Sequence, residues 1–176
     1  TEILGSIAKS FALPVVQVGG PSLLSDHPMN LGYAAGEHLP DADVILVIES
    51  AVPWIPRNVE PNKKAKIIHL SPDPHYSGLP YRGFEMDLAI AGEPLQSLKL
   101  IEDALISHKE LRREDISKRY SIIESLHNEH VAKKIKVINS ANTDTPISTS
   151  WVAACLNKVK SDDSIIVSEL GLNIDH

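Results

Sequence analysis

A short apolar run that is cut off by two prolines constrains the fold of this chain more than any other feature. The run covers 67–70, contains His69, and is followed at once by Ser71-Pro72-Asp73-Pro74. Proline lacks a backbone donor and fixes φ, so neither a helix nor a central strand continues through this tetrapeptide. The pattern predicts a buried parallel strand. Open α/β sheets bind ligands at the carboxyl ends of such strands, so His69 and Asp73 either serve a ligand or only finish a core strand.

Other apolar segments predict an α/β fold around this strand. The run 44–48 has five apolar residues in a row, which predicts a strand covered on both faces. Helical spacing of apolar residues alternates with further short runs, which favours βαβ crossovers. We therefore expect a three-layer, Rossmann-like parallel sheet flanked by helices. Further strands are expected at 15–18 and 87–92, and helices at 3–11, from Ser25 or Asp26 through 35, and from Glu93-Pro94 through 106.

The second half of the chain changes in character after residue 107. Mixed charges with apolar residues at helical spacing predict a solvated helical connector up to 136, followed by a polar linker from Asn139. His127 and His130 lie three apart on that helix, and we expect them to be solvated because no further metal ligands are apparent. Ser148 is expected to cap a new helix, and 164–168 to form a strand. The expected units are 1–107, a connector over 108–146, and 147–176.

Composition excludes several classes of function. The formal net charge is −6, which argues against nucleic-acid binding through a general basic field. One cysteine, Cys155, leaves no internal disulfide framework and fits a cytoplasmic protein. No apolar run approaches about 18 residues, so no membrane-spanning helix is expected.

The order of these segments resembles the central domain of thiamine-diphosphate-dependent enzymes of the acetolactate-synthase-like superfamily. Those relatives carry a "DHPxxxG" segment, a strand after an "AD" pair, a strand of the type "AKxIHIDxDP", and a short strand that begins with aspartate. The last 30 residues resemble the start of the family's diphosphate-binding domain. The matching positions here are Asp26-His27-Pro28, Gly32, Ala42-Asp43, Ala65-Lys66, Ile68-His69, Asp73-Pro74, Asp87, Glu169 and Gly171.

The resemblance implies an enzyme that makes or breaks C–C bonds next to the carbonyl of 2-keto acids or related substrates, with thiamine diphosphate and Mg²⁺ as cofactors. It implies that the edge of the cofactor pocket is formed by Glu169, Gly171, Leu172 and Asn173. The sequence has no "GDG" metal segment. We therefore expect a catalytically inactive piece of a longer enzyme, which is a homodimer or homotetramer when complete.

The family's central domain binds FAD or ADP in some members, and the contacts implied here are Gly32, His69, Ser71 and Asp73. Two departures disfavour this use. Glu49 stands where flavin-binding relatives have glycine, and a carboxylate repels a pyrophosphate; Ser71 replaces an acid. Trp54 is expected either to cover a pocket or to fill a gap in the core. The alternatives to the enzyme are a non-catalytic module that binds ADP, FAD or NAD, and an oligomer scaffold.

Overall fold

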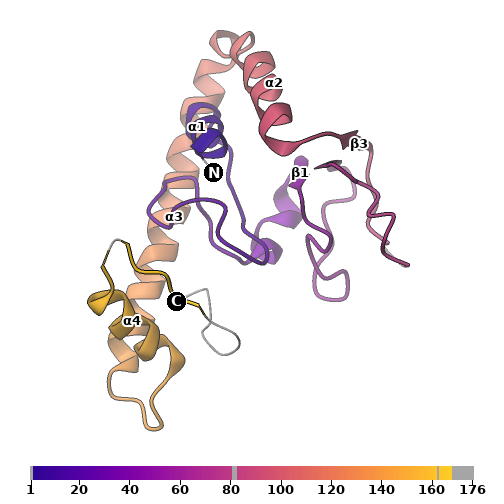
Figure 1. Cartoon of the computed structure of the whole chain (residues 1–176). Helices are drawn as coiled ribbons and strands as arrows, with labels where there is room; N and C mark the ends of the chain where they lie inside the picture. The colour runs from indigo at the N-terminus through magenta and orange to yellow at the C-terminus, as the bar shows by residue number, and fades with distance from the viewer. Residues whose placement is uncertain (1, 81–82, 162, 168–176) are drawn as a thin grey trace.

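The computed structural model describes residues 2–80, 83–161 and 163–167 and has an α/β fold. Its sheet has three parallel strands in the order β1-β2-β3, formed by Val44–Ile48, Lys66–Ser71 and Leu88–Ala91. Figure 1 shows the sheet on one side of the molecule and the long helix α3 on the other. The three strands were all predicted from the sequence, and the run that ends in two prolines is the central one.

The two faces of the sheet are covered unequally. On one face, Val47 and Ile67 are buried with Leu39 and Trp54. On the other face, Ile48 packs against a cluster of Ile7, Phe11 and Leu98 from α1 (Glu2–Phe11) and α2 (Pro94–Ile106). That cluster lies at the carboxyl half of β1 and leaves three apolar side chains near the strand beginnings exposed: Val44 by 55%, Leu46 by 37% and Leu88 by 51%.

The prediction that both faces of 44–48 are covered was therefore wrong for Val44 and Leu46. β1 pairs only with β2 in the described part of the chain, so it lies at an edge of the sheet. The apolar stripe expected on α2 is likewise narrower than its sequence suggests. Leu98 is its buried residue, whereas Leu95 and Ile106 are exposed.

The segment before the sheet differs most from the expected structure. The strand expected at 15–18 is reduced to a single parallel bridge between Val15 and Asn30. The helix expected through residue 35 is replaced by turns and by the short 3-10 helices η1 (Ala35–Glu37) and η2 (Leu39–Asp41). The physical reason is local: the Asn30 amide donates to the carbonyls of Leu23 and Leu24, and its oxygen accepts from the Gly32 N–H. Such side-chain bonds to the backbone compete with a helix.

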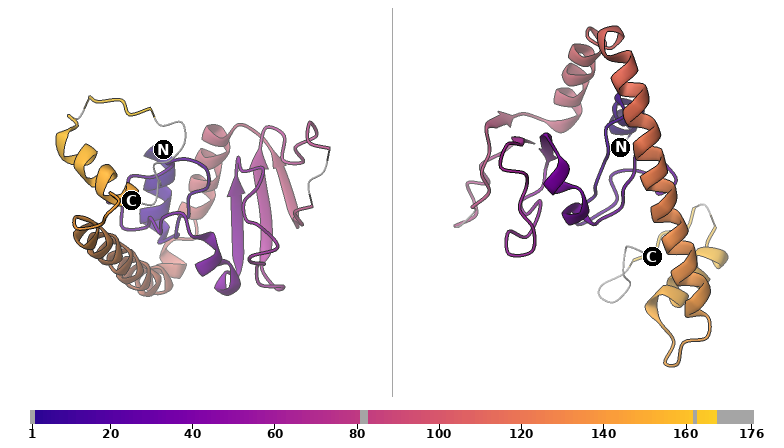
Figure 2. Two further views of the ribbon diagram at one scale, coloured as in Figure 1. Left: turned by 90° about the horizontal axis from the view of Figure 1, so that it is seen from below. Right: turned by 180° about the vertical axis from the view of Figure 1, so that it is seen from behind.

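Helix α3 (Arg113–Ala141) follows a 3-10 turn, η3 (Glu110–Arg112), and runs for 29 residues. It extends beyond the expected end at 136 and takes in part of the expected linker. Figure 2 shows it passing along the N-terminal segment, which lies between this helix and the sheet. Ile123 is buried with Ala8, Met29 and Leu31. The Arg119 guanidinium donates to the carbonyls of Phe11 and Ala12, each at 2.7 Å, and so satisfies the end of α1.

Helix α4 (Thr149–Val159) packs against α3. Ser148 caps it as predicted, because its Oγ accepts from the Trp151 N–H at 3.3 Å. The strand expected at 164–168 was wrong for 164–167: Ile165 and Val167 are exposed by 90% and 91%, and no described strand pairs with this segment. Ser168 lies outside the described residues. Across the described ranges, none of the helices combines the length and the apolarity that a membrane crossing requires.

Candidate functional site

The loop that follows β2 is held by its own side chains. Ser71 Oγ accepts from the Asp73 N–H at 3.2 Å. Asp73 Oδ2 in turn accepts from the Ser77 N–H at 2.7 Å and from the Ser77 hydroxyl at 2.8 Å. These bonds, led by the Ser77 hydroxyl, hold the pKa of Asp73 below its usual value. The Asp73 carboxylate therefore shapes the turn at the carboxyl end of the central strand.

His69 lies in the interior of the sheet. It is aligned with Val47 of β1 and Ala89 of β3, and it is 1% exposed. Its place in the middle of β2 makes it a core residue, two positions before Ser71. A ligand at the carboxyl edge of the sheet meets Ser71 and the 72–77 turn before it meets His69.

Gly32 lies in another part of the fold. Its φ of +74° belongs to the left-handed region, its N–H donates to Asn30 Oδ1 at 2.8 Å, and its carbonyl accepts from the Gln17 N–H at 2.8 Å. It lines a cavity to which His69, Ser71 and Asp73 do not contribute. The four residues implied for nucleotide binding are thus divided between two places. Those implied for the edge of the thiamine-diphosphate pocket, Glu169, Gly171, Leu172 and Asn173, lie outside the described residues.

Glu49 directly follows β1 and has a backbone conformation that is unusual for a residue with a side chain. Its φ is +48°, and its N–H donates to the Leu70 carbonyl at 3.0 Å. Backbone strain of this kind clusters at functional sites. The exposed carboxylate places negative charge beside the carboxyl edge of the sheet.

Trp54 closes one face of the sheet and also lines a groove. Its ring meets Phe84 edge to face, with 5.3 Å between centroids and planes at 87°. The groove has a volume of about 350 Å³ and runs between the 50–59 loop and the segments around Gly19 and Gly36. Its described lining carries no charged side chain, so it suits an apolar or flat uncharged group. Both roles expected for Trp54 are thus met by one side chain.

The expectation that His127 and His130 are solvated was wrong. His127 is buried, and its Nδ1–H donates to the Asn30 carbonyl at 2.7 Å. His130 lies against Gly32: a Cβ built on that glycine meets His130 Nε2 at 2.6 Å. The mixed charges of α3 suggested a solvated helix, so this packing was not predicted from the sequence. The signal that was available is the 4-4-3 spacing of Arg119, Ile123, His127 and His130, which places them on one face of the helix.

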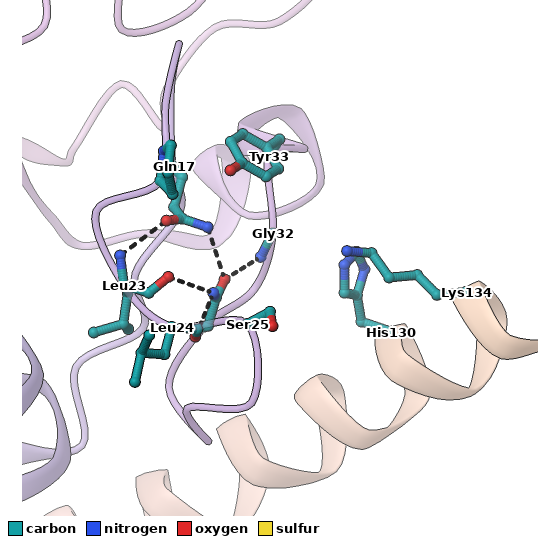
Figure 3. A pocket seen from close by; sticks show the side chains of 10 residues that line it. Gln17, Leu23, Leu24, Ser25, Gly32, Tyr33, His130 and Lys134 are labelled. Atoms are coloured by element: carbon teal, nitrogen blue, oxygen red, sulfur yellow. Dashed lines mark hydrogen bonds between the residues drawn. The ribbon is translucent and has the colours of Figure 1, made fainter. Parts of the chain in front are cut away.

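His130 and Lys134 line a second cavity, with a volume of about 260 Å³, between α3 and the 17–33 loop. Figure 3 shows both side chains reaching from the helix toward Gly32 and Tyr33. The opposite wall is braced by Gln17, whose Oε1 accepts from the N–H groups of Ser22 and Leu23 at 2.6 and 2.9 Å. Among its lining residues, the sequence analysis implied a ligand contact only for Gly32.

The side chains that the structure describes contain no group of three or more His, Cys, Asp or Glu residues able to hold a metal ion. Cys155 is exposed on α4. Comparison of the chain with models of known protein families, with curated proteins and with solved structures found no match.

Proposed function

We propose that this chain is the central domain, with the beginning of the diphosphate-binding domain, of a thiamine-diphosphate-dependent enzyme of the acetolactate-synthase-like type. The proposed activity makes or breaks C–C bonds next to the carbonyl of 2-keto acids or related substrates. One observation supports the proposal: strands β1, β2 and β3 lie in or directly beside the segments that resemble the superfamily, since β1 follows Ala42-Asp43, β2 begins at Lys66 and β3 follows Asp87.

A salt bridge between two of the positions that match the superfamily adds support to the proposal. Lys66 and Asp87 both belong to the matching positions, and they are 21 residues apart in the sequence. Lys66 Nζ lies 2.6 Å from Asp87 Oδ1, and Asp87 Oδ2 accepts from the Ile67 N–H at 2.9 Å. Two residues of separate motifs therefore join neighbouring strands, which gives both motifs a shared structural purpose.

We further propose that the sheet belongs to a three-layer, Rossmann-like domain. Support comes from α1 and α2 on one face, and from η2 and the loop containing Trp54 on the other. Such a domain spaces the catalytic domains of a cytoplasmic homodimer or homotetramer, and the exposed apolar side chains Val44, Leu46 and Leu88 suit contact with further protein.

The cofactor, when bound, supplies the electron sink for carbanion chemistry. The described residues do not fit a role as its metal site, because they offer no cluster of metal ligands and the sequence has no "GDG" segment. We therefore propose that this chain acts by positioning: its sheet and the hydrogen-bonded loop after β2 would hold the carboxyl edge of the sheet in place for further domains.

The proposal is tested by the natural gene product that contains this sequence. Purified with Mg²⁺ and thiamine diphosphate, it is expected to consume pyruvate or another short 2-keto acid, and to lose this activity when the cofactor is omitted. Residues 1–176 alone are expected to show no strong binding of thiamine diphosphate by calorimetry. Submicromolar binding of thiamine diphosphate by residues 1–176 contradicts the proposal. So does a natural gene product that neither binds the cofactor nor turns over any such acid.

A second candidate is a non-catalytic module that binds a nucleotide, and the groove beside Trp54 favours it. The groove has a volume of about 350 Å³, and its uncharged lining, which includes Trp54, Gly19 and Gly36, suits the flat ring of a nucleotide. Melting temperatures measured with ADP, FAD and NAD separate the two candidates, because a ligand at 100 times its Kd stabilises the folded state by about 2.7 kcal/mol. A third role, as an oligomer scaffold without ligands, predicts no shift with any of the three.

A further inference from the structure

The cavity between α3 and the 17–33 loop carries an inference that is independent of the proposed enzyme activity. We propose that this cavity binds a small organic monocarboxylate, with the Lys134 ammonium as the charged partner. The ligand class follows from three properties of the cavity: its charge, the direction of its polar groups, and the apolar patch on its far wall.

The one permanent charge in the described lining of the cavity is positive. Among the described residues that line it, Lys134 is the one side chain with a permanent charge, and none is a carboxylate. No described carboxylate forms an ion pair with Lys134. A half-buried ammonium without a counter-ion attracts an anion, and one positive charge balances one negative charge rather than two.

The polar groups converge on one end of the cavity. His130 and Lys134 are four residues apart on α3, so their side chains project from the same face of the helix. Figure 3 shows both of them directed at the Gly32–Tyr33 segment. Tyr33 and Ser25 are further hydroxyl-bearing residues in the lining. A carboxylate beside Lys134 thus has further side chains around it that can form hydrogen bonds.

The rest of the lining favours an organic acid over a bare inorganic anion. Pro21 and the exposed Leu24 provide apolar surface on the loop side. A short alkyl chain fills that side while its carboxylate meets Lys134, whereas inorganic phosphate or chloride leaves the apolar wall uncovered. The volume of about 260 Å³ suits an acid of a few carbon atoms.

The walls are held in place without a ligand. Asn30 Nδ2 donates to the Leu24 carbonyl at 2.9 Å, and Gln17 Oε1 accepts from two loop N–H groups. On the helix side, His127 donates to the Asn30 carbonyl and His130 rests on Gly32. A preformed site loses little conformational freedom on binding, which favours measurable affinity for a small ligand.

The test is an NMR titration of the full 176-residue chain, labelled with ¹⁵N, at pH 7 and constant ionic strength. Sodium propionate replaces sodium chloride stepwise, and a parallel series uses sodium phosphate. We expect saturable shifts of the Gly32 and Tyr33 amide signals with propionate, and weaker or no saturation with phosphate. Lys134→Met is expected to weaken propionate binding at least about tenfold. Its matched control, Lys133→Met, alters an exposed neighbour outside the lining and is expected to leave the Kd within about twofold.

A second variant addresses the opposite wall. Leu24 is exposed, and Leu24→Trp is expected to occupy part of the cavity and abolish the saturable shifts without unfolding the chain. This variant decides the question if Lys134→Met fails to fold by circular dichroism. Shifts that do not saturate with propionate overturn the proposal. So does phosphate binding that is as tight as propionate binding, or propionate binding that survives Leu24→Trp or a folded Lys134→Met.

Discussion

The Lys66 ammonium and the Asp87 carboxylate connect the first residue of β2 to the residue that precedes β3. Their contact at 2.6 Å is accompanied by the hydrogen bond from the Ile67 N–H to the second carboxylate oxygen. The Lys66 hydrogen bond, followed by that of the Ile67 N–H, lowers the pKa of Asp87. One carboxylate thus links two parallel strands at the ends where they begin.

This link makes stability depend on pH in the acid range. Because the folded-state pKa of Asp87 lies below its unfolded value of about 3.9, the stabilisation is present above about pH 4. It is lost as the pH falls through the folded-state value. Asp87→Asn is expected to lower the melting temperature at pH 7 and to reduce the further loss below pH 4. Thermal denaturation between pH 3 and pH 7 measures this, with Asp103→Asn on exposed α2 surface as the control. Equal acid sensitivity in Asp87→Asn and the parent chain contradicts the assignment.

Because β2 is the central strand, a Leu→Ala substitution within it is expected to reduce stability far more than the same substitution on the surface. Leu70 is 0% exposed and is aligned with Ile48 and Ile90, whereas Leu100 on α2 is 70% exposed. Leu70→Ala is expected to cost about 2–5 kcal/mol in the free energy of unfolding. Leu100→Ala is expected to stay within about 0.5 kcal/mol of the parent. Urea denaturation measures both, and similar midpoints for the two variants are incompatible with a core around β2.

Alanine substitutions at three glycines distinguish the energetic cost of a strained backbone from the cost of a steric clash. Gly19 has a φ of +79° and open space around its Cβ position, and Gly20 has open space without a positive φ. Gly32 has a φ of +74°, and a Cβ added there would lie only 2.6 Å from His130 Nε2. Gly19→Ala is expected to cost about 1–2 kcal/mol, and Gly20→Ala to be neutral or slightly stabilising. Gly32→Ala is expected to cost more than Gly19→Ala in urea denaturation. Equal costs for these two show that His130 gives way without penalty.

His27 predicts a second pH dependence, closer to neutrality. Burial lowers the pKa of His27 and outweighs the opposing hydrogen bond with the Gly5 backbone. Its Nδ1 accepts from the Met29 N–H at 3.2 Å, which requires the neutral ring. Since the folded-state pKa is below the unfolded value of about 6.5, stability declines as the pH falls below that value.

His27→Asn keeps an acceptor for the Met29 N–H and removes the titrating group. It is expected to flatten the decline in melting temperature between pH 7 and pH 5. His75→Asn, at an exposed position, leaves His27 in place and is expected to keep the decline. A decline that is unchanged in His27→Asn and abolished in His75→Asn places the titrating group elsewhere.

The sequence was informative wherever one strong local signal decided the structure. Prolines ended β2 and began α2, an uninterrupted apolar run defined β1, and Ser148 capped α4. These features depend on residues within a few positions of each other. The exposure of Val44 and Leu46 could not be predicted from the sequence, because the coverage of their strand depends on how far α1 and α2 extend across the sheet.

Long-range partners account for the remaining differences. Nothing near Asn30 in the sequence reveals that its side chain binds Leu24 and Gly32, or that its carbonyl receives His127 from 97 residues away. The cavity beside Lys134 depends on that same contact, so its lining was not predictable from local patterns. The two histidines on α3 were predicted to be solvated because most residues of the helix are charged or polar. Their 3–4 residue spacing from Arg119 and Ile123 instead places them on the helix face that packs against the N-terminal segment.

The three contacts made by Arg119, Ile123 and His127 also fix the rotational phase of the long helix. Each follows the last by four residues, and each meets a partner in the first 31 residues of the chain. Deleting one residue between Arg119 and His127 turns one relative to the other by about 100°. Length changes within this stretch are therefore incompatible with keeping both contacts, whereas changes beyond residue 141 leave the phase untouched.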